Sequence, residues 1–82
     1  MFRRMARAPV PDPQLGAVLR RLREAQGLTL ESLAHEVGIT TGTLSRIEIA
    51  QSAPAWDTVR RIADALDVSL AKLGKQVDAE RK

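Results

Sequence analysis

The sequence predicts a compact all-α domain of five helices that follows an extended N-terminal arm. Composition is the first indication: 44% of the residues are hydrophobic but only 2% are aromatic, so the core must be built from aliphatic side chains. Such a core suits packed helices better than sheets, whose strands favour β-branched and aromatic residues. Apolar residues that recur at helical spacing are the second indication. The length of 82 residues leaves room for one domain and little more.

The first helix is expected at residues 14–26. Its apolar residues follow the i, i+3, i+4, i+7 pattern of one buried helix face; they are Leu15, Val18, Leu19 and Leu22. Pro13 fits the first turn of this helix, and Gly27 can end it in a left-handed conformation. Residues 1–13 combine alternating prolines with three arginines, so they are expected to form a flexible, extended basic arm.

Two short helices are expected at residues 30–37 and 41–49, with a turn at Gly38 between them. Thr29 and Thr40 each stand directly before one of these helices, where a side-chain oxygen can accept from a free backbone N–H group. Two helices joined by so short a turn must cross at a steep angle, which is the arrangement of a helix-turn-helix.

A fourth helix is expected at residues 56–66, with Trp56 on its apolar stripe. A fifth helix follows, and Gly74 is expected to end or loosen it. The chain is therefore divided into the arm, a helical domain at residues 14–74 and a polar C-terminal tail at residues 75–82.

The residue content argues against several classes of protein. The chain has no cysteine and one histidine, His35, so neither a disulfide nor a zinc site is expected. One histidine and scattered carboxylates make no catalytic constellation, so neither an enzyme nor a cofactor is expected. No stretch approaches the roughly 20 apolar residues of a membrane span, and no apolar signal-peptide segment follows the first arginines. The chain is expected to act in the cytoplasm and away from membranes.

Charge is distributed unevenly along the chain. The formal net charge of +3 favours a polyanionic partner. The arm and the first helix carry most of the excess arginine. Residues 29–50, in contrast, set Arg46 against Glu31, Glu36 and Glu48, a net charge of −2. The helix-turn-helix segment is thus acidic, and the positive charge lies around it.

The second short helix has a front that can enter a DNA groove. With Leu44 and Ile47 directed inward, the opposite face is free to enter a major groove about 12 Å wide. The outer residues are Gly42, Ser45, Arg46 and Ile49, with Thr41 and Thr43 on the flanks. Small residues at the N-terminal end of this helix would let it approach base edges closely.

The order of motifs over residues 15–73 resembles the lambda-repressor-like, Cro-type (XRE) helix-turn-helix family. The stretches that carry the resemblance are Leu19 to Thr29, Leu33-Ala34, Gly38-Ile39-Thr40, Thr43 to Glu48, Pro54, and Ile62 to Ser69. The resemblance implies the five-helix fold of that family and a sequence-specific, DNA-binding transcriptional regulator of the repressor or controller type.

The resemblance also implies contacts with double-stranded DNA. Thr41, Gly42 and Arg46 match positions that read bases in the major groove. Ser45 and Ile49 are added as base contacts because they share the outer face. Contacts to phosphate are expected from the starts of the two short helices, the loop after the second and the arm; the residues are Thr29, Thr40, Thr43, Gln51, Ser52 and Arg4.

One implied role is structural, and two departures weaken the expected contacts. Arg23 and Glu48 match an ion pair that ties the first helix to the recognition helix. The family often has glutamine where Leu30 stands and Arg-Gly where Ile49-Ala50 stands. A monomer is therefore expected to discriminate modestly between sequences, or to depend on DNA shape and dimerisation.

A homodimer on a pseudo-palindromic operator is expected because one recognition helix binds weakly, with the two helices roughly 34 Å apart. The candidate dimer surface is the fifth helix, through Leu70, Leu73 and Val77. The alternative is that the two leucines complete the core of the monomer. The arm is likewise either disordered or in contact with DNA through Arg4.

A second function is left open. An antitoxin-like or anti-regulator module of this fold would bind a protein partner, such as a toxin, with DNA binding secondary or lost. The acidic charge of residues 29–50, together with Leu30, Ile49 and Ala50, favours this alternative.

Overall fold

The computed structural model describes residues 11–80 of the chain. Its five helices are α1 (Pro13–Ala25), α2 (Leu30–Val37), α3 (Thr41–Glu48), α4 (Trp56–Ala65) and α5 (Leu70–Glu80). No strand occurs within the described range, so the all-α prediction is confirmed. The ends of the first four helices lie within one residue of the expected positions. Most of the arm, including Arg4, lies outside the described residues.

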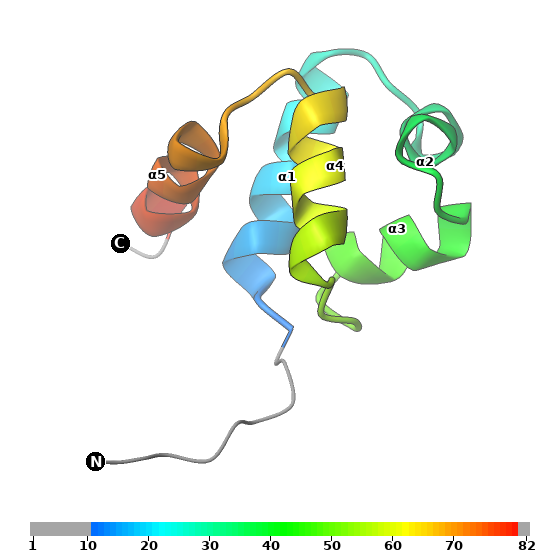
Figure 1. Cartoon of the computed structure of the whole chain (residues 1–82). Helices are drawn as coiled ribbons and strands as arrows, with labels where there is room; N and C mark the ends of the chain where they lie inside the picture. Colours follow the sequence, from blue (N-terminus) through cyan, green and yellow to red (C-terminus); the bar gives the residue numbers. More distant parts are fainter. Residues whose placement is uncertain (1–10, 81–82) are drawn as a thin grey trace.

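Each helix packs against two others, so that the five helices enclose one core. α1 packs against α3 and α5, α2 packs against α3 and α4, and α4 packs against α5. Figure 1 shows α5 on one side of the molecule and α2 with α3 on the other. The side chains that fill this core are aliphatic, as the composition predicts; the largest fully buried ones are Val18, Leu19, Leu33, Leu44, Ile62 and Leu66.

Local side-chain contacts begin the helices where the sequence predicts. Thr29 caps α2 and Thr40 caps α3, each accepting from a backbone N–H group three residues on. At α2, the Ser32 hydroxyl oxygen accepts from the backbone N–H of Thr29, and the two reciprocal hydrogen bonds form a capping box. Asp12 caps α1 by accepting from the N–H groups of Gln14 and Leu15, a role that the sequence reasoning did not assign.

The first four helices each lead into a residue with positive φ, at Gly27, Gly38, Ala50 and Asp67. Gly38, with a φ of 85°, gives the sharp turn between α2 and α3 at no steric cost. Ala50 adopts a φ of 61° although it has a Cβ, which costs about 1–2 kcal/mol in the left-handed region. Asp67 also has a positive φ, of 57°, but aspartate tolerates this region better than alanine, so the end of α3 is the most strained member of this set.

Two expectations about the C-terminal half are wrong. α5 does not end at Gly74 but continues to Glu80, so most of the expected tail is helical. A glycine inside a helix costs only about 1 kcal/mol relative to alanine, and the Arg21–Glu80 ion pair, 2.7 Å long, holds the added turn against α1. Trp56 does not join the core: it is 65% exposed, because it lies in the first turn of α4, where an open groove replaces a packed neighbour.

Candidate nucleic-acid interface

The back of α3 is fixed by the core, as the helical wheel predicts. Leu44 and Ile47 are both buried. Ala34 of α2 is buried as well, and its small side chain allows the two helices to cross closely. Arg61 of α4 donates to the carbonyl oxygen of Val37 over 2.9 Å, which ties the end of α2 to α4. The sequence reasoning did not identify this contact, since an exposed arginine carries no signal for a distant carbonyl.

The C-terminal end of α3 lies directly against α1. A Cβ atom at Gly16 would overlap the carbonyl oxygen of Glu48 and would lie 2.7 Å from that of Ile47. A side chain at this position would therefore push the recognition helix away from α1. Gly16 was missed by the sequence reasoning, because a glycine inside a helix marks a close approach only when the partner element is known.

Arg23 and Glu48 form the predicted ion pair between α1 and α3. Arg23 Nε lies 2.9 Å from Glu48 Oε2 and Arg23 Nη2 lies 3.1 Å from Glu48 Oε1, so the pair is bidentate. The two residues are only 8% and 7% exposed. The hydrogen bond to Glu48 raises the pKa of Arg23, against the lowering caused by burial, so the guanidinium stays charged. Arg23 Nη1 also donates to the carbonyl oxygen of Leu28 over 2.8 Å. This hydrogen bond ties the α1–α2 loop to the ion pair.

The front of α3, defined by Thr41, Gly42, Ser45, Arg46 and Ile49 and called the recognition face below, points away from this support. Thr41, Gly42, Arg46 and Ile49 are exposed, and Ser45 is half-buried. Their exposure agrees with the outward direction that the helical wheel predicts, and their roles as base contacts stay predictions. Ile49 is 53% exposed, a high value for a large aliphatic side chain.

Arg46 lies back along α3 toward its N-terminal end. Its Nη2 atom is 3.5 Å from Thr43 Oγ1, and Thr43 in turn accepts from the hydroxyl of Thr40 over 2.8 Å. A Cβ atom at Gly42 would lie 3.4 Å from Arg46 Nη1, so the missing side chain leaves room for the guanidinium. The Arg46 guanidinium therefore lies over Gly42 and beside the Thr43 hydroxyl.

The expected phosphate contacts surround the recognition face. Thr29 and Thr40 stand at the exposed starts of α2 and α3, where N–H groups without helical partners favour an anion. After α3, Gln51 is exposed and Ser52 is half-buried. The N–H of Gln51 donates to the carbonyl of Arg46 over 2.8 Å, which closes the end of α3 and orients this loop.

The expected dimer residues lie on the other side of α1. Leu70 and Val77 are half-buried, but Leu73 is 3% exposed and belongs to the core of the protomer. The alternative that the two leucines complete the monomer core is thus correct for Leu73.

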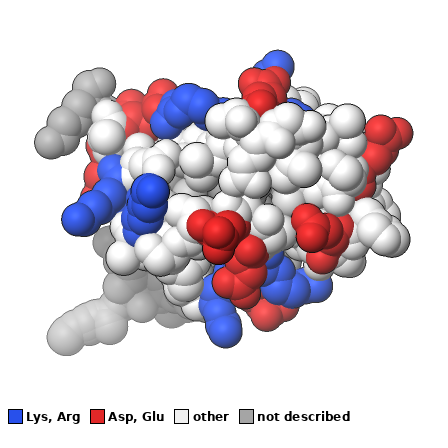
Figure 2. Space-filling model, turned by 90° about the horizontal axis from the view of Figure 1, so that it is seen from above, with Lys and Arg blue, Asp and Glu red and all other residues white. Residues whose placement is uncertain are grey.

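Charge is mixed on the surface away from α3. The view from above shows basic and acidic side chains next to each other around uncharged areas (Figure 2). Exposed pairs such as Arg20–Glu24, 3.2 Å apart, neutralise part of the positive charge locally. No broad basic field therefore identifies this face as a second nucleic-acid surface.

Other kinds of site find no support in residues 11–80. In that range no three histidine, aspartate or glutamate side chains come together in a way that could hold a metal ion. No helix in that range is long and apolar enough to cross a membrane.

Comparison with known proteins gives matches over most of the chain. Residues 14–74 match the family of helix-turn-helix domains. A protein of Methanocaldococcus jannaschii, named as an HTH-type transcriptional regulatory protein, is 33% identical over 57 residues, which are 70% of this chain and 18% of that protein. The chain thus spans less than a fifth of the length of this relative.

Solved structures resemble the fold closely. The clp gene regulator ClgR from Corynebacterium glutamicum superposes with a TM-score of 0.82 at 27% identity, over 92% of this chain and 97% of that chain. The restriction-modification controller protein C.AhdI from Aeromonas hydrophila gives a TM-score of 0.72 at 31% identity, over 74% of this chain and 92% of that chain. The chain belongs to the helix-turn-helix domain family, in agreement with its lambda-repressor-like, Cro-type sequence motifs.

Proposed function

We propose that the protein is a sequence-specific DNA-binding transcriptional regulator that inserts α3 into the major groove. The observation that carries this proposal is the contrast between the two sides of α3, whose back is locked by core residues and whose front is exposed and composed mostly of small residues. A rigid helix with a low-relief front can approach base edges, which a bulky surface would prevent. The regulators among the similar proteins support the same function.

Base contacts are assigned to the recognition face. Arg46 is the one residue of this set with a guanidinium, and guanidinium pairs best with the O6 and N7 acceptors of guanine. Thr41 and Ser45 offer hydroxyls that suit several bases, and Ile49 suits a thymine methyl. Gly42 offers no side-chain contact. We therefore expect a guanine to be the most selective position of each half-site.

Phosphate contacts are assigned to the rim of the same surface. Thr29, Thr40 and Thr43 would act with the N–H groups of their helix starts, and Gln51 and Ser52 would act from the loop after α3. Arg4 would add a contact from the arm. These contacts orient α3 without reading sequence.

A single short recognition helix makes few specific contacts, so we propose that the protein acts as a homodimer on a pseudo-palindromic operator. The expected dimer surface includes α5. The proposal assigns no enzymatic activity and no cofactor to the chain, and it places the protein with the DNA in the cytoplasm.

Selection of bound DNA from a random pool, followed by a salt titration of the selected site, tests this function. The expected result is an enriched pair of inverted half-sites that contain a guanine, with an affinity that falls log-linearly as salt rises. Recovery of no enriched sequence, or an affinity that does not respond to salt, would contradict the proposal.

A protein-interaction module of the antitoxin or anti-regulator type is the second candidate. The exposed side chain of Ile49 on an acidic segment favours it, because an apolar contact there would suit a protein partner better than phosphate. A partner complex that rests on Ile49 would persist at high salt and would be weakened by Ile49→Asp, whereas operator binding would be lost as salt rises.

A further inference from the structure

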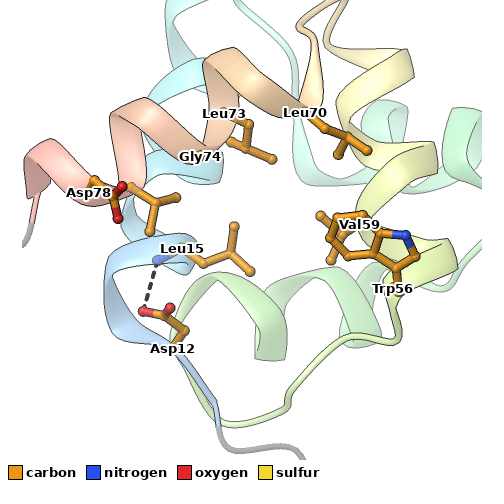
Figure 3. A pocket seen from close by; sticks show the side chains of 9 residues that line it. Asp12, Leu15, Trp56, Val59, Leu70, Leu73, Gly74 and Asp78 are labelled. Carbon is orange, nitrogen blue, oxygen red and sulfur yellow. Dashed lines mark hydrogen bonds between the residues drawn. The ribbon is translucent and has the colours of Figure 1, made fainter.

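The two sides of α4 differ in what they contact. The side toward α5 lines an apolar groove between α1, α4 and α5, and the exposed Trp56 stands at one end of that groove (Figure 3). The walls of the groove are aliphatic and come from all three helices: Leu15, Val59, Leu70, Leu73 and Val77. The side toward α2 carries Arg61, whose guanidinium reaches the turn that precedes α3. Arg61 therefore connects a core helix to the element proposed to read DNA.

Arg61 contacts the last carbonyl group of α2. Its Nη1 atom donates to the carbonyl oxygen of Val37 over 2.9 Å. At this end of a helix the last carbonyl groups have no helical partner, and the helix dipole favours a cation. A hydrogen bond from a guanidinium is charge-assisted and stronger than one between neutral groups. Asp57, one turn earlier on α4, orients the guanidinium through an ion pair of 3.2 Å to Arg61 Nε.

This contact acts on the turn itself. The peptide group that joins Val37 to Gly38 is planar, so a fixed direction of its carbonyl also fixes the direction of the Gly38 N–H group. That N–H group donates back into α2, over 2.9 Å to the carbonyl oxygen of Ala34. A Cβ atom at Gly38 would lie 3.5 Å from Arg61 Nη1, so the guanidinium lies directly against the residue whose positive φ turns the chain. The start of α3 follows from the conformation of this turn.

An arginine thus holds each end of α3. The Arg23–Glu48 pair attaches the C-terminal end to α1, and the Arg61 contact fixes the turn that leads into the N-terminal end. A helix of 8 residues is about 12 Å long, so a tilt of about 10° would move one end by about 2 Å. A shift of that size exceeds the range of hydrogen-bond lengths to a base edge. The direction of α3 therefore depends on both contacts.

We propose that Arg61 is a positioning residue for DNA recognition, which sets the direction of α3 through the Val37 carbonyl and does not itself contact DNA. The inference rests on the proposed function and adds to it a residue that lies outside the recognition face. Because base contacts carry the sequence discrimination and phosphate contacts do not, a misdirected α3 should bind with less selectivity between sequences.

The test compares two affinities of the full chain, one for the selected operator and one for a site whose guanine is replaced. Arg61→Met keeps an aliphatic stem but removes the charge and the hydrogen-bond donors. The ratio of the two affinities is expected to fall about fivefold or more, the lower end of the discrimination that one bidentate base contact supplies. Partial unfolding lowers both affinities by the same factor and leaves their ratio as it was. An unchanged ratio would therefore overturn the proposal.

Arg60→Met is the matched control. Arg60 precedes Arg61 on α4 and is exposed, and it makes no hydrogen bond or ion pair with any other residue of the range 11–80. Its substitution removes the same charge from the same helix and is expected to keep the wild-type ratio. Equal falls in the two variants would show that the carbonyl contact is not the cause. A ratio near one in the wild-type chain would instead contradict the proposed function, and this inference with it.

A conservative variant and a salt titration separate positioning from direct contact. Arg61→Lys keeps the charge and a donor, so it is expected to recover part of the ratio lost in Arg61→Met, and no recovery would contradict the hydrogen bond as the cause. The slope of log affinity against log salt should be the same in Arg61→Met and Arg60→Met, because a positioning residue releases no counterion. A slope smaller by about one in Arg61→Met alone would identify a phosphate contact and overturn the proposal.

Discussion

The recognition face and the apolar groove are two surfaces of the same five helices, and they are built in opposite ways. The recognition face is mostly polar, with Ile49 as its one large apolar side chain, and α3 behind it is held by buried contacts such as the Arg23–Glu48 pair. The groove is apolar and open, and its largest side chain, Trp56, is 65% exposed. The comparison shows that the recognition face is held in place by contacts within the protomer, whereas the groove leaves apolar side chains exposed to solvent.

Among the substitutions considered, removal of the Glu48 carboxylate is expected to destabilise the protein most. Glu48→Ala should lower the free energy of unfolding by about 3 kcal/mol, because it leaves the buried Arg23 guanidinium without its partner. Denaturation by urea measures this loss. Glu24→Ala removes an exposed carboxylate that pairs with Arg20 and lies 3.9 Å from Arg23 at the rim of the buried pair, and it should cost less than about 0.5 kcal/mol. Equal losses would show that the buried pair adds nothing to the attachment of α3.

The recognition face itself is tested at Arg46. Arg46→Ala should leave the stability nearly unchanged and should weaken binding to the selected operator by about 1–3 kcal/mol, with the guanine preference relaxed. Fluorescence anisotropy with the selected and a substituted site measures both effects. Arg21→Ala removes one positive charge from the far side, where Arg21 pairs with Glu80, and serves as the control. A uniform loss on all sequences would indicate that Arg46 contacts phosphate instead.

The close approach of α1 to α3 is tested by a pair of glycine substitutions. Gly16→Ala should destabilise the protein by about 1–3 kcal/mol, because the new methyl group meets backbone that cannot move aside cheaply. Gly74→Ala faces open space and should stabilise by about 0.5–1 kcal/mol through helix propensity. The midpoint temperatures of thermal unfolding should therefore shift in opposite directions for the two variants. Shifts in the same direction would contradict this prediction.

The smallest expected effect is a gain in stability from a substitution directly after α3. Ala50→Gly should stabilise the protein by about 0.5–1 kcal/mol, because glycine relieves the left-handed strain but adds freedom to the unfolded chain. Asp67→Gly makes the same change after α4 and should gain less, since aspartate tolerates positive φ better than alanine. Urea unfolding of both variants ranks them, and a loss of stability in Ala50→Gly would contradict the assigned strain.

The helix-turn-helix was predictable because its signals are local. Thr29, Thr40 and Gly38 fix where α2 and α3 begin and turn, and the inward direction of Leu44 and Ile47 follows from helical spacing alone. The Arg23–Glu48 pair came from family resemblance rather than from spacing, since 25 residues separate the partners. The candidate base contacts follow from the same wheel and stay predictions.

The features that sequence reasoning missed depend on packing between distant segments. Gly74 is a poor helix residue, yet α5 continues past it, with Val77 packed against the core and Glu80 paired with Arg21 of α1. Trp56 fits the apolar stripe of α4, but whether that turn is covered depends on where α5 lies. Gly16 looks like a weak point in α1 until the end of α3 is placed against it.

The position of α1 has a consequence for operator geometry. It packs against both α3 and α5, so in the proposed homodimer, whose expected surface includes α5, α1 would set the distance between the recognition helix and the two-fold axis. Changes along α1 would then alter the number of base pairs between half-sites, while changes on α3 would alter which bases are chosen. Spacer length and base preference could in this way diverge independently among relatives of this chain.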